Sequence, residues 1–333
     1  MKSKWLLTGG GGFVASHFIN FLLKQNEDVI VTTRWNEDTS RIEHVKDKIK
    51  IVQADLLDLS SLIRVIADNK PDIISHLAAE SFVNSGFVSP IITIETNTIG
   101  TVNLFEAIRI VKDYIDKSYN PIIHVVSSSE VYGKVDINET PINEDNQIRP
   151  GNQYAIGKIG ADMTAQFYCK YYNFNVIITR MFTHFSIGRT MKSAEVNFAQ
   201  QIAKIELSLQ EPTVKHGNLN SVRTFADARD AVEAYYMLIK NGNIGEIYNI
   251  GGEEVYTIEE MLDYLIELSP MKDKIKKELD DSLMRKLDIN LQIVDIDKFK
   301  KVCPEWRPKI TLKQSLKELL DWCRIEVKNG KRF

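Results

Sequence analysis

The 333-residue sequence lacks clustered cysteines, long apolar runs and a strong net charge, the features that would distinguish it from ordinary globular proteins. Its only cysteines, Cys169, Cys303 and Cys323, lie far apart without CxxC spacing, so we expect reduced thiols in a cytoplasmic protein. No apolar run approaches the roughly 18 residues of a membrane span, and the N-terminal stretch is not expected to be a signal peptide. The net charge of −3 argues against nucleic acid or membrane as a partner, and metal-ligand spacing is absent.

Apolar segments of strand length alternate with helical segments through the first half of the chain. Strands are predicted at 4–9, 28–34, 49–55, 72–79, 121–129 and 175–182. This alternation predicts an α/β protein with a Rossmann-type, doubly wound parallel sheet. We expect residues 1–185 to form the dinucleotide-binding domain and segments near 220–252 to return to it. Residues 186–333 are expected to form a smaller, interleaved C-terminal lobe that binds the substrate.

A run of glycines follows the first predicted strand in the segment TGGGGFVAS. Gly9, Gly12 and Ala15 stand three residues apart, just where a helix is predicted to begin. Such a turn lets the backbone approach a pyrophosphate and directs helix amide groups at it. We therefore predict that Gly9, Gly12, Phe13 and Val14 bind a dinucleotide.

Arg34 ends the second predicted strand, where a carboxylate would hydrogen-bond the ribose hydroxyls of NAD. An arginine there, with Arg41 further on, can hold a 2′-phosphate, so NADP is favoured over NAD. The alternatives are an arginine stacked on the adenine of NAD or a solvated loop. Further cofactor contacts are predicted after the third and fourth strands, at Asp55, Leu56, Leu77, Ala78 and Ala79.

The segment YAIGK places Tyr154 and Lys158 one helical turn apart on the same face. An ammonium group near a phenol is expected to lower the pKa of the phenol. The phenolate can then take a proton from a sugar hydroxyl while a hydride leaves the same carbon for nicotinamide. The pair is therefore predicted to be catalytic and to contact the cofactor.

Together the segments TGGGGFVAS, HLAAES, SSSEVYG, YAIGK and YNIGG resemble the extended short-chain dehydrogenases/reductases that act on nucleotide sugars, over essentially the whole chain. SSSEVYG is similar to the Ser-Thr-Ser-Glu or Ser-Thr-Asp-Glu stretch of nucleotide-sugar 4,6-dehydratases. The resemblance implies that Ser128 hydrogen-bonds the C4 oxygen and that Glu130 removes the C5 proton. Many 4-epimerases lack this glutamate. Ser129 resembles the GDP-mannose type, because dTDP-glucose dehydratases have aspartate there.

The second half of the chain resembles the substrate side of the same family. HGNLNSVRTF is similar to a stretch of GDP-mannose 4,6-dehydratases, and Asp288 is expected to orient the loop that contains Arg285. Thr183 replaces the usual asparagine and could admit a bulkier sugar, such as an N-acetylated hexose or a heptose. His184 is expected to serve packing or to be a donor on the phosphate side, rather than a general base, and His76 and His124 are expected to be satisfied core residues. The implied substrate contacts are Ser81, Thr183, Arg189, Lys204, Arg223 and Arg285.

The resemblance implies a cycle of C4 oxidation, water elimination across C5–C6 and C6 reduction on a GDP-hexose, with tightly bound cofactor recycled. The candidate sugars are GDP-mannose and a GDP-N-acetylhexosamine such as GDP-GlcNAc, for glycan biosynthesis. The alternatives are a GDP-4-keto-6-deoxy-sugar reductase, a GDP-sugar or heptose C4 dehydrogenase and a UDP-glucuronate decarboxylase. A non-catalytic dinucleotide sensor is disfavoured, since the Tyr-Lys pair is retained. Apolar helices at 89–111 and 152–172 predict a homodimer or homotetramer, as in the family.

Overall fold

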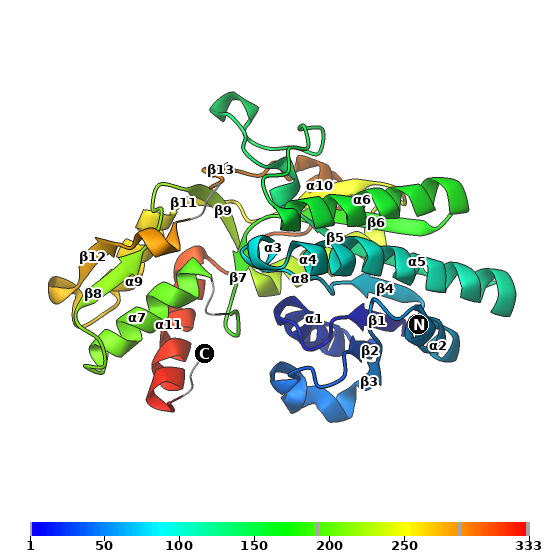
Figure 1. The fold of residues 1–333 in the computed structure, drawn as a ribbon, viewed down its shortest axis with the longest axis horizontal. Helices are drawn as coiled ribbons and strands as arrows, with labels where there is room; N and C mark the ends of the chain where they lie inside the picture. The colour runs from blue at the N-terminus through cyan, green and yellow to red at the C-terminus, as the bar shows by residue number, and fades with distance from the viewer. Residues whose placement is uncertain (1, 191–192, 285–287, 331–333) are drawn as a thin grey trace.

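The computed structural model describes residues 2–190, 193–284 and 288–330. Its centre is a seven-stranded parallel sheet with the strand order β10-β6-β5-β4-β1-β2-β3 (Figure 1). The predicted Rossmann-type sheet is confirmed. The strands of this sheet are β1 (Lys4–Thr8), β2 (Asp28–Thr33), β3 (Lys50–Gln53), β4 (Ile73–His76), β5 (Ile122–Ser128), β6 (Asn175–Met181) and β10 (Ile247–Ile250).

Helices cover both faces of this sheet, because successive side chains of a strand point to opposite faces. Trp5 and Leu7 of β1 pack in one apolar core, while Leu6 between them packs in another. The first core includes side chains of α1 (Phe13–Lys24) and α8 (Ala228–Asn241). The second core includes side chains of α2 (Leu59–Asn69), α5 (Gly100–Ile110) and α6 (Gln153–Tyr172).

The smaller lobe, to the left of the sheet in Figure 1, contains two short sheets and their helices. In one sheet β9 pairs with β11, β13 and β7, and in the other β12 pairs with β8. A third apolar core joins the lobe's helices to β8 and β9. The elements are β7 (His184–Phe185), α7 (Ala194–Glu206), β8 (Thr213–His216), β9 (Val222–Asp227), β11 (Glu254–Thr257), α9 (Ile258–Glu267), β12 (Lys276–Leu279), β13 (Leu291–Gln292) and α11 (Leu312–Lys328).

Some elements differ from the simple alternation read from the sequence. The long helix expected at 89–111 is a run of α and π segments that extends to residue 115, and a 3-10 helix lies between β2 and β3. All three cysteines are free. Within the described ranges, no helix has the length and apolar character to cross a membrane. The remaining elements are η1 (Ser40–Lys48), α3 (Ser85–Val88), α4 (Pro90–Ile94), η2 (Glu95–Ile99), η3 (Val111–Ile115), η4 (Ser129–Tyr132), η5 (Ile137–Glu139), η6 (Lys272–Lys274), η7 (Asp281–Leu283) and α10 (Asp297–Val302).

Candidate active site

The glycine turn between β1 and α1 is packed too tightly for side chains. Gly9 has a φ of +73°, and a Cβ there would stand 2.9 Å from the Cα of Ala78. A Cβ on Gly11 would stand 2.6 Å from the carbonyl oxygen of Asp38. Gly12 caps α1 without a side-chain hydrogen bond, so the helix amide groups open onto the turn. The turn and the segment after β4 thus lie together, and this backbone fits a dinucleotide pyrophosphate.

The residues predicted to select the cofactor lie at the ends of β2 and β3. Arg34 is exposed, and its backbone N–H donates to the carboxylate of Glu37 over 2.8 Å. Arg41 donates from Nε to the carbonyl of Gly188 over 2.9 Å, which ties η1 to the loop after β7. Asp55 is exposed and accepts the N–H of Leu57 in its own turn, while Leu56 is buried.

Tyr154 and Lys158 lie in the first turns of α6, as predicted. Asn152 caps this helix by accepting the N–H of Ala155 over 2.8 Å. The Lys158 ammonium is buried and donates to the carbonyl of Val126 over 2.7 Å. This burial lowers the pKa of Lys158 to about 8.

The expected lowering of the Tyr154 pKa is not what the structure shows. Burial raises the pKa of Tyr154 to about 12, although a hydrogen bond with Ser128 acts in the lowering direction. The charge of Glu130 raises it further, and the charge of Arg189 lowers it. The expectation of a lowered Tyr154 pKa was wrong for the protein without cofactor or substrate, because desolvation of the phenol outweighs the nearby positive charge. Tyr154 therefore retains its proton in this arrangement.

Glu130 lies at the carboxyl end of β5, next to the tyrosine. Its N–H donates to Ser128 Oγ over 3.2 Å, which holds the short helix η4 at the strand end. Its Oε2 accepts from Asn152 Nδ2 over 3.0 Å, and Gln292 Nε2 lies 3.4 Å from its Oε1. Ser129 is buried in η4. The structure therefore brings Ser128, Glu130 and Tyr154 together at one strand end.

The predicted substrate residues form a less uniform group. Arg189 contacts the carbonyl of His184 and pairs with Glu195, 3.2 Å away, and its charge also acts on Tyr154. Thr183 lies just before β7 and accepts the N–H of Ala226 through its carbonyl. Lys204 is in the last turn of α7, and Ser81 is exposed in the loop after β4. Arg285 lies outside the described residues.

Arg223 is buried in β9 and already has protein partners. Its guanidinium donates to Gln292 Oε1 and to the carbonyl of Ile289, and Asp288 lies 3.9 Å away. Asp288 also accepts from Asn218 over 2.7 Å. Arg223 therefore holds the segment around β13, whatever else it binds.

Two residues of this site were missed by the sequence reasoning. Asn152 bonds Glu130 and also caps α6, and an asparagine just before a helix is a recognisable N-cap signal. Gln292 contacts Glu130 from 162 positions along the chain. No local pattern could have found this second contact.

His76, His124 and His184 are hydrogen-bonded to neighbouring groups of the protein, as predicted for core and packing residues. His124 is buried between the hydroxyls of Ser75 and Thr179, and His76 lies between two threonine hydroxyls. Burial lowers the pKa of both to about 3. His184 Nδ1 donates to the carbonyl of Phe182 over 3.0 Å, and burial lowers the pKa of His184 to about 4. All three are therefore neutral at physiological pH.

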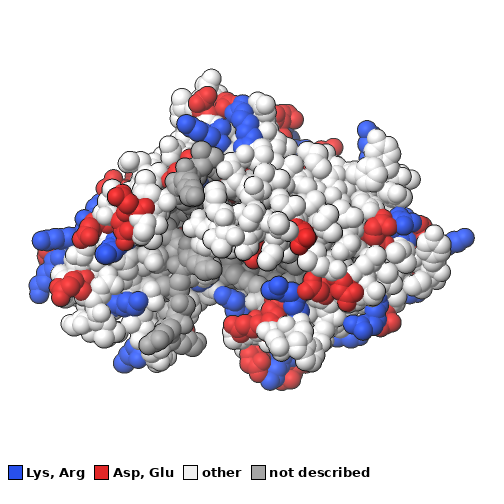
Figure 2. Space-filling model, viewed as in Figure 1, with Lys and Arg blue, Asp and Glu red and all other residues white. Residues whose placement is uncertain are grey.

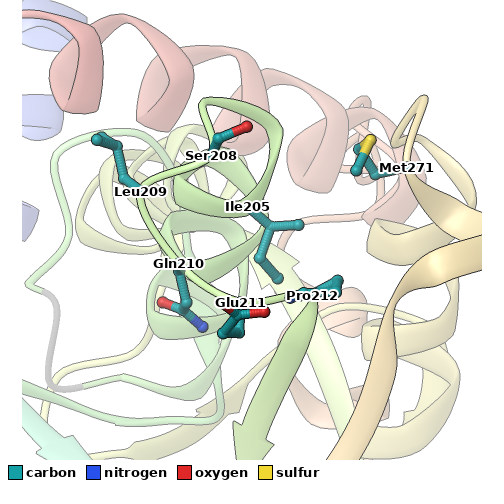
Figure 3. A pocket seen from close by; sticks show the side chains of 7 residues that line it. All are labelled: Ile205, Ser208, Leu209, Gln210, Glu211, Pro212 and Met271. Carbon is teal, nitrogen blue, oxygen red and sulfur yellow. The ribbon is translucent and has the colours of Figure 1, made fainter.

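A shallow pocket at the end of α7 is a separate feature (Figure 3). Among the described residues, those predicted to bind cofactor or substrate do not line it. The part of the chain that the structure describes contains no cluster of three or more His, Cys, Asp or Glu side chains that could hold a metal ion. The site at the end of β5 therefore remains the candidate for chemistry. The pocket is lined by Ile205, Ser208, Leu209, Gln210, Glu211, Pro212 and Met271.

This arrangement is that of the extended short-chain dehydrogenases/reductases, which bind a nicotinamide cofactor on a Rossmann-type sheet. The family model described as GDP-mannose 4,6 dehydratase matches residues 6–319. The chain therefore belongs to this family of nucleotide-sugar dehydratases and reductases.

Individual relatives within the family are distant. The chain is 27% identical to a GDP-6-deoxy-D-mannose reductase of Pseudomonas aeruginosa, with 97% of this chain and 98% of that protein covered. It is 26% identical to a dTDP-glucose 4,6-dehydratase of Haemophilus influenzae, with 95% and 96% covered.

Solved structures show the same fold. RMD of Pseudomonas aeruginosa with NADPH has a TM-score of 0.78 at 24% identity, covering 97% of this chain and 100% of that one. A dTDP-glucose 4,6-dehydratase of Bacillus anthracis with NAD has a TM-score of 0.81 at 25% identity, covering 97% of each chain.

Proposed function

We propose that the protein is a nucleotide-sugar 4,6-dehydratase that converts a GDP-hexose to the GDP-4-keto-6-deoxy sugar. GDP-mannose and a GDP-N-acetylhexosamine such as GDP-GlcNAc are the candidate substrates. The observation that carries the proposal is the Glu130 carboxylate beside the Tyr154–Ser128 pair at the end of β5. A carboxylate in this place can move the C5 proton, which oxidation at C4 alone does not require.

Each side chain has a separate role in this cycle. Tyr154 takes the proton of the C4 hydroxyl, with Ser128 hydrogen-bonded to the same oxygen. An oxidised nicotinamide dinucleotide, held by the glycine turn between β1 and α1, would supply an acceptor for the C4 hydride and a donor of hydride to C6. Glu130 takes the C5 proton, made acidic by the C4 ketone, and passes it to the departing C6 oxygen, so that water leaves. Because Tyr154 is protonated in the cofactor-free protein, proton removal from the C4 hydroxyl requires its phenolate, which the buried Lys158 ammonium and the positive charge of a bound oxidised nicotinamide would favour.

The proton balance fits the positions of these groups. A hydride removed from C4 would return to C6, and a proton from solvent would return to C5, offsetting the proton released by the C4 hydroxyl. The sugar would then undergo no net oxidation, and one water molecule would be the only product besides the keto sugar. The cofactor is therefore proposed to stay bound and to be recycled. Arg34 favours NADP, although the Glu37 carboxylate lies beside the same turn.

A 4-keto-6-deoxy-sugar reductase is the second candidate, favoured by the Pseudomonas aeruginosa relative. That reaction needs Tyr154 and Lys158, but it does not remove the C5 proton and so assigns no role to Glu130. A reductase consumes one nicotinamide per sugar, whereas the proposed dehydratase consumes none. A C4 dehydrogenase would likewise turn over cofactor, and a UDP-glucuronate decarboxylase would release carbon dioxide.

Mass spectrometry of four sugars separates these reactions. The protein, without added cofactor, is incubated with GDP-mannose, GDP-GlcNAc, dTDP-glucose and UDP-glucuronate. A GDP-hexose that loses the mass of water is the expected result, abolished in Glu130→Gln and retained in the control Glu139→Gln. Glu139 is a nearby carboxylate paired with Arg149. Loss of carbon dioxide from UDP-glucuronate alone would refute the dehydratase. In a parallel incubation with NADPH and a GDP-4-keto-6-deoxy sugar, stoichiometric oxidation of NADPH without water loss from any of the four sugars would refute it as well.

The helices α4 and α6 support the proposed homodimer. Figure 2 shows a broad area over them with few charged side chains. Ile91 is 70% exposed, Ile92 56% and Phe167 48%. An area with few charges that also exposes large apolar side chains is typical of a protein interface. Phe167→Glu should convert the dimer to a monomer in light scattering, and a monomeric wild-type protein would contradict the proposal.

A further inference from the structure

Gln292 is a buried amide between two charged residues. Its side chain is 2% exposed. Its Nε2 faces Glu130 Oε1 at 3.4 Å, while its Oε1 accepts from Nη1 of Arg223. The amide thus presents its donor to the carboxylate and its acceptor to the guanidinium. Rotating the amide by half a turn would place it against both charges with the wrong polarity.

The segment that contains Gln292 is bound to both lobes. In the small lobe β13 pairs with β9, and Gln292 lies opposite Arg223. Directly afterwards the chain pairs with the β5–α6 connection. Ile142 donates to the carbonyl of Ile293 over 2.7 Å, and its carbonyl accepts from Asp295 over 2.8 Å. Gln292 is therefore fixed by backbone hydrogen bonds on either side.

The two oxygens of Glu130 are held from different parts of the molecule. Asn152 binds Oε2 from the start of α6, the helix that contains Tyr154. Gln292 approaches Oε1 from β13. With Asn152 alone, the carboxylate could turn about its last bond, because one contact fixes a point and not a plane. The second contact defines the direction in which the free lone pairs point.

We propose that Gln292 is a positioning residue, which sets the orientation of Glu130 and couples it to Arg223. This inference rests on the proposed function, in which Glu130 moves the C5 proton, and on the prediction that Arg223 contacts the substrate. A group that orients a catalytic carboxylate acts on the chemical step more than on substrate binding. Misorientation of the base lowers kcat, while the nucleotide contacts that dominate KM remain.

Two substitutions at this position separate the contact with Glu130 from the contact with Arg223. Gln292→Met keeps the length of the side chain and removes both hydrogen bonds. Gln292→Glu still accepts from Arg223 but replaces the donor toward Glu130 with a second carboxylate. Gln201→Met is the matched control, because Gln201 is a buried glutamine of α7 that is bonded to Asn197 and Lys215. Its partners do not include Glu130.

The measurement is kcat and KM on the GDP-hexose that the wild-type protein dehydrates. Gln292→Met and Gln292→Glu should each lower kcat about tenfold with KM changed less than about threefold. Gln201→Met should leave kcat within about twofold. A near-wild-type Gln292→Glu would overturn the inference, because it would show that only the Arg223 contact matters. An equal loss of kcat in Gln201→Met would overturn it as well.

A double-mutant cycle measured by thermal unfolding tests the contact between Gln292 and Glu130 without any turnover. The Tm of Gln292→Met, Glu130→Gln and the double variant should be non-additive by about 1–2 °C, as for residues in contact. If the wild-type protein dehydrates none of the four sugars, the proposed function fails, but the double-mutant cycle still shows whether Gln292 and Glu130 are coupled. Additive Tm changes would show that Gln292 and Glu130 are not coupled and would overturn the inference. If the wild-type protein dehydrates a sugar but the Gln292 variants keep its kcat, the inference is overturned while the proposed function stands.

Discussion

Replacing Lys158 with methionine should stabilise the protein at neutral pH while impairing catalysis. Methionine keeps most of the apolar length of lysine and removes the buried ammonium. Burial lowers the Lys158 pKa from 10.5 to about 8. Because one pKa unit corresponds to about 1.4 kcal/mol, holding this charge costs the folded state about 3 kcal/mol at pH 7. The Val126 carbonyl loses its donor, which costs about 1–2 kcal/mol, so the net gain is about 1–2 kcal/mol.

The sign of the effect should change with pH. The folded-state pKa lies below the unfolded one, so between pH 8 and pH 10.5 the unfolded chain binds more protons at this lysine. The penalty is therefore fully present below pH 8 and disappears as the pH rises toward 10.5. Near pH 10 about 0.8 kcal/mol of the penalty is left, which is less than the cost of the lost hydrogen bond, so Lys158→Met should be slightly the less stable protein.

Urea unfolding of cofactor-free protein at pH 7, 8, 9 and 10 measures this difference. Lys170→Met is the matched control, because Lys170 is an exposed lysine on the same helix. The control should change the free energy of unfolding by less than about 0.5 kcal/mol at every pH. A Lys158→Met variant that is destabilised equally at pH 7 and pH 10 would refute the reasoning from burial.

Three further substitutions test separate parts of the account. Arg180→Leu should lower the free energy of unfolding by about 3–5 kcal/mol in urea, because the buried Asp162, 2.9 Å from Arg180, loses its partner. Adding Asp162→Leu should recover part of this loss, and no recovery would contradict the ion-pair explanation. Tyr154→Phe should lower kcat about 10²–10⁴-fold with dinucleotide affinity unchanged by fluorescence titration; retained kcat would exclude Tyr154 as the base. Arg34→Ser should weaken NADP binding at least about tenfold and NAD binding little, by calorimetry; equal losses would refute 2′-phosphate recognition.

Local sequence patterns were sufficient for the sheet and the glycine turn. The continuous apolar run of Trp5, Leu6 and Leu7 specifies a strand buried on both faces. Position 9 admits only glycine, because a Cβ there would stand 2.9 Å from the Cα of Ala78. The four-residue spacing of Tyr154 and Lys158 likewise determines that both lie on one helix face.

Other properties depend on contacts that no local pattern contains. The direction of the Tyr154 pKa follows from burial, which is a property of the folded environment. Gln292 and Glu130 meet only because β13 pairs with β9 and then with the β5–α6 connection. The buried partners of Arg223 could not be read from the motif around it.

Transfer of a label within the sugar tests the central claim most directly. A GDP-hexose deuterated at C4 is incubated with the protein and no added cofactor, and the position of deuterium in the product is determined by mass spectrometry and NMR. The account predicts deuterium in the C6 methyl group of a 4-keto product, with none formed by Glu130→Gln. Deuterium in released nicotinamide, or retained at C4 of the product, would contradict a 4,6-dehydratase.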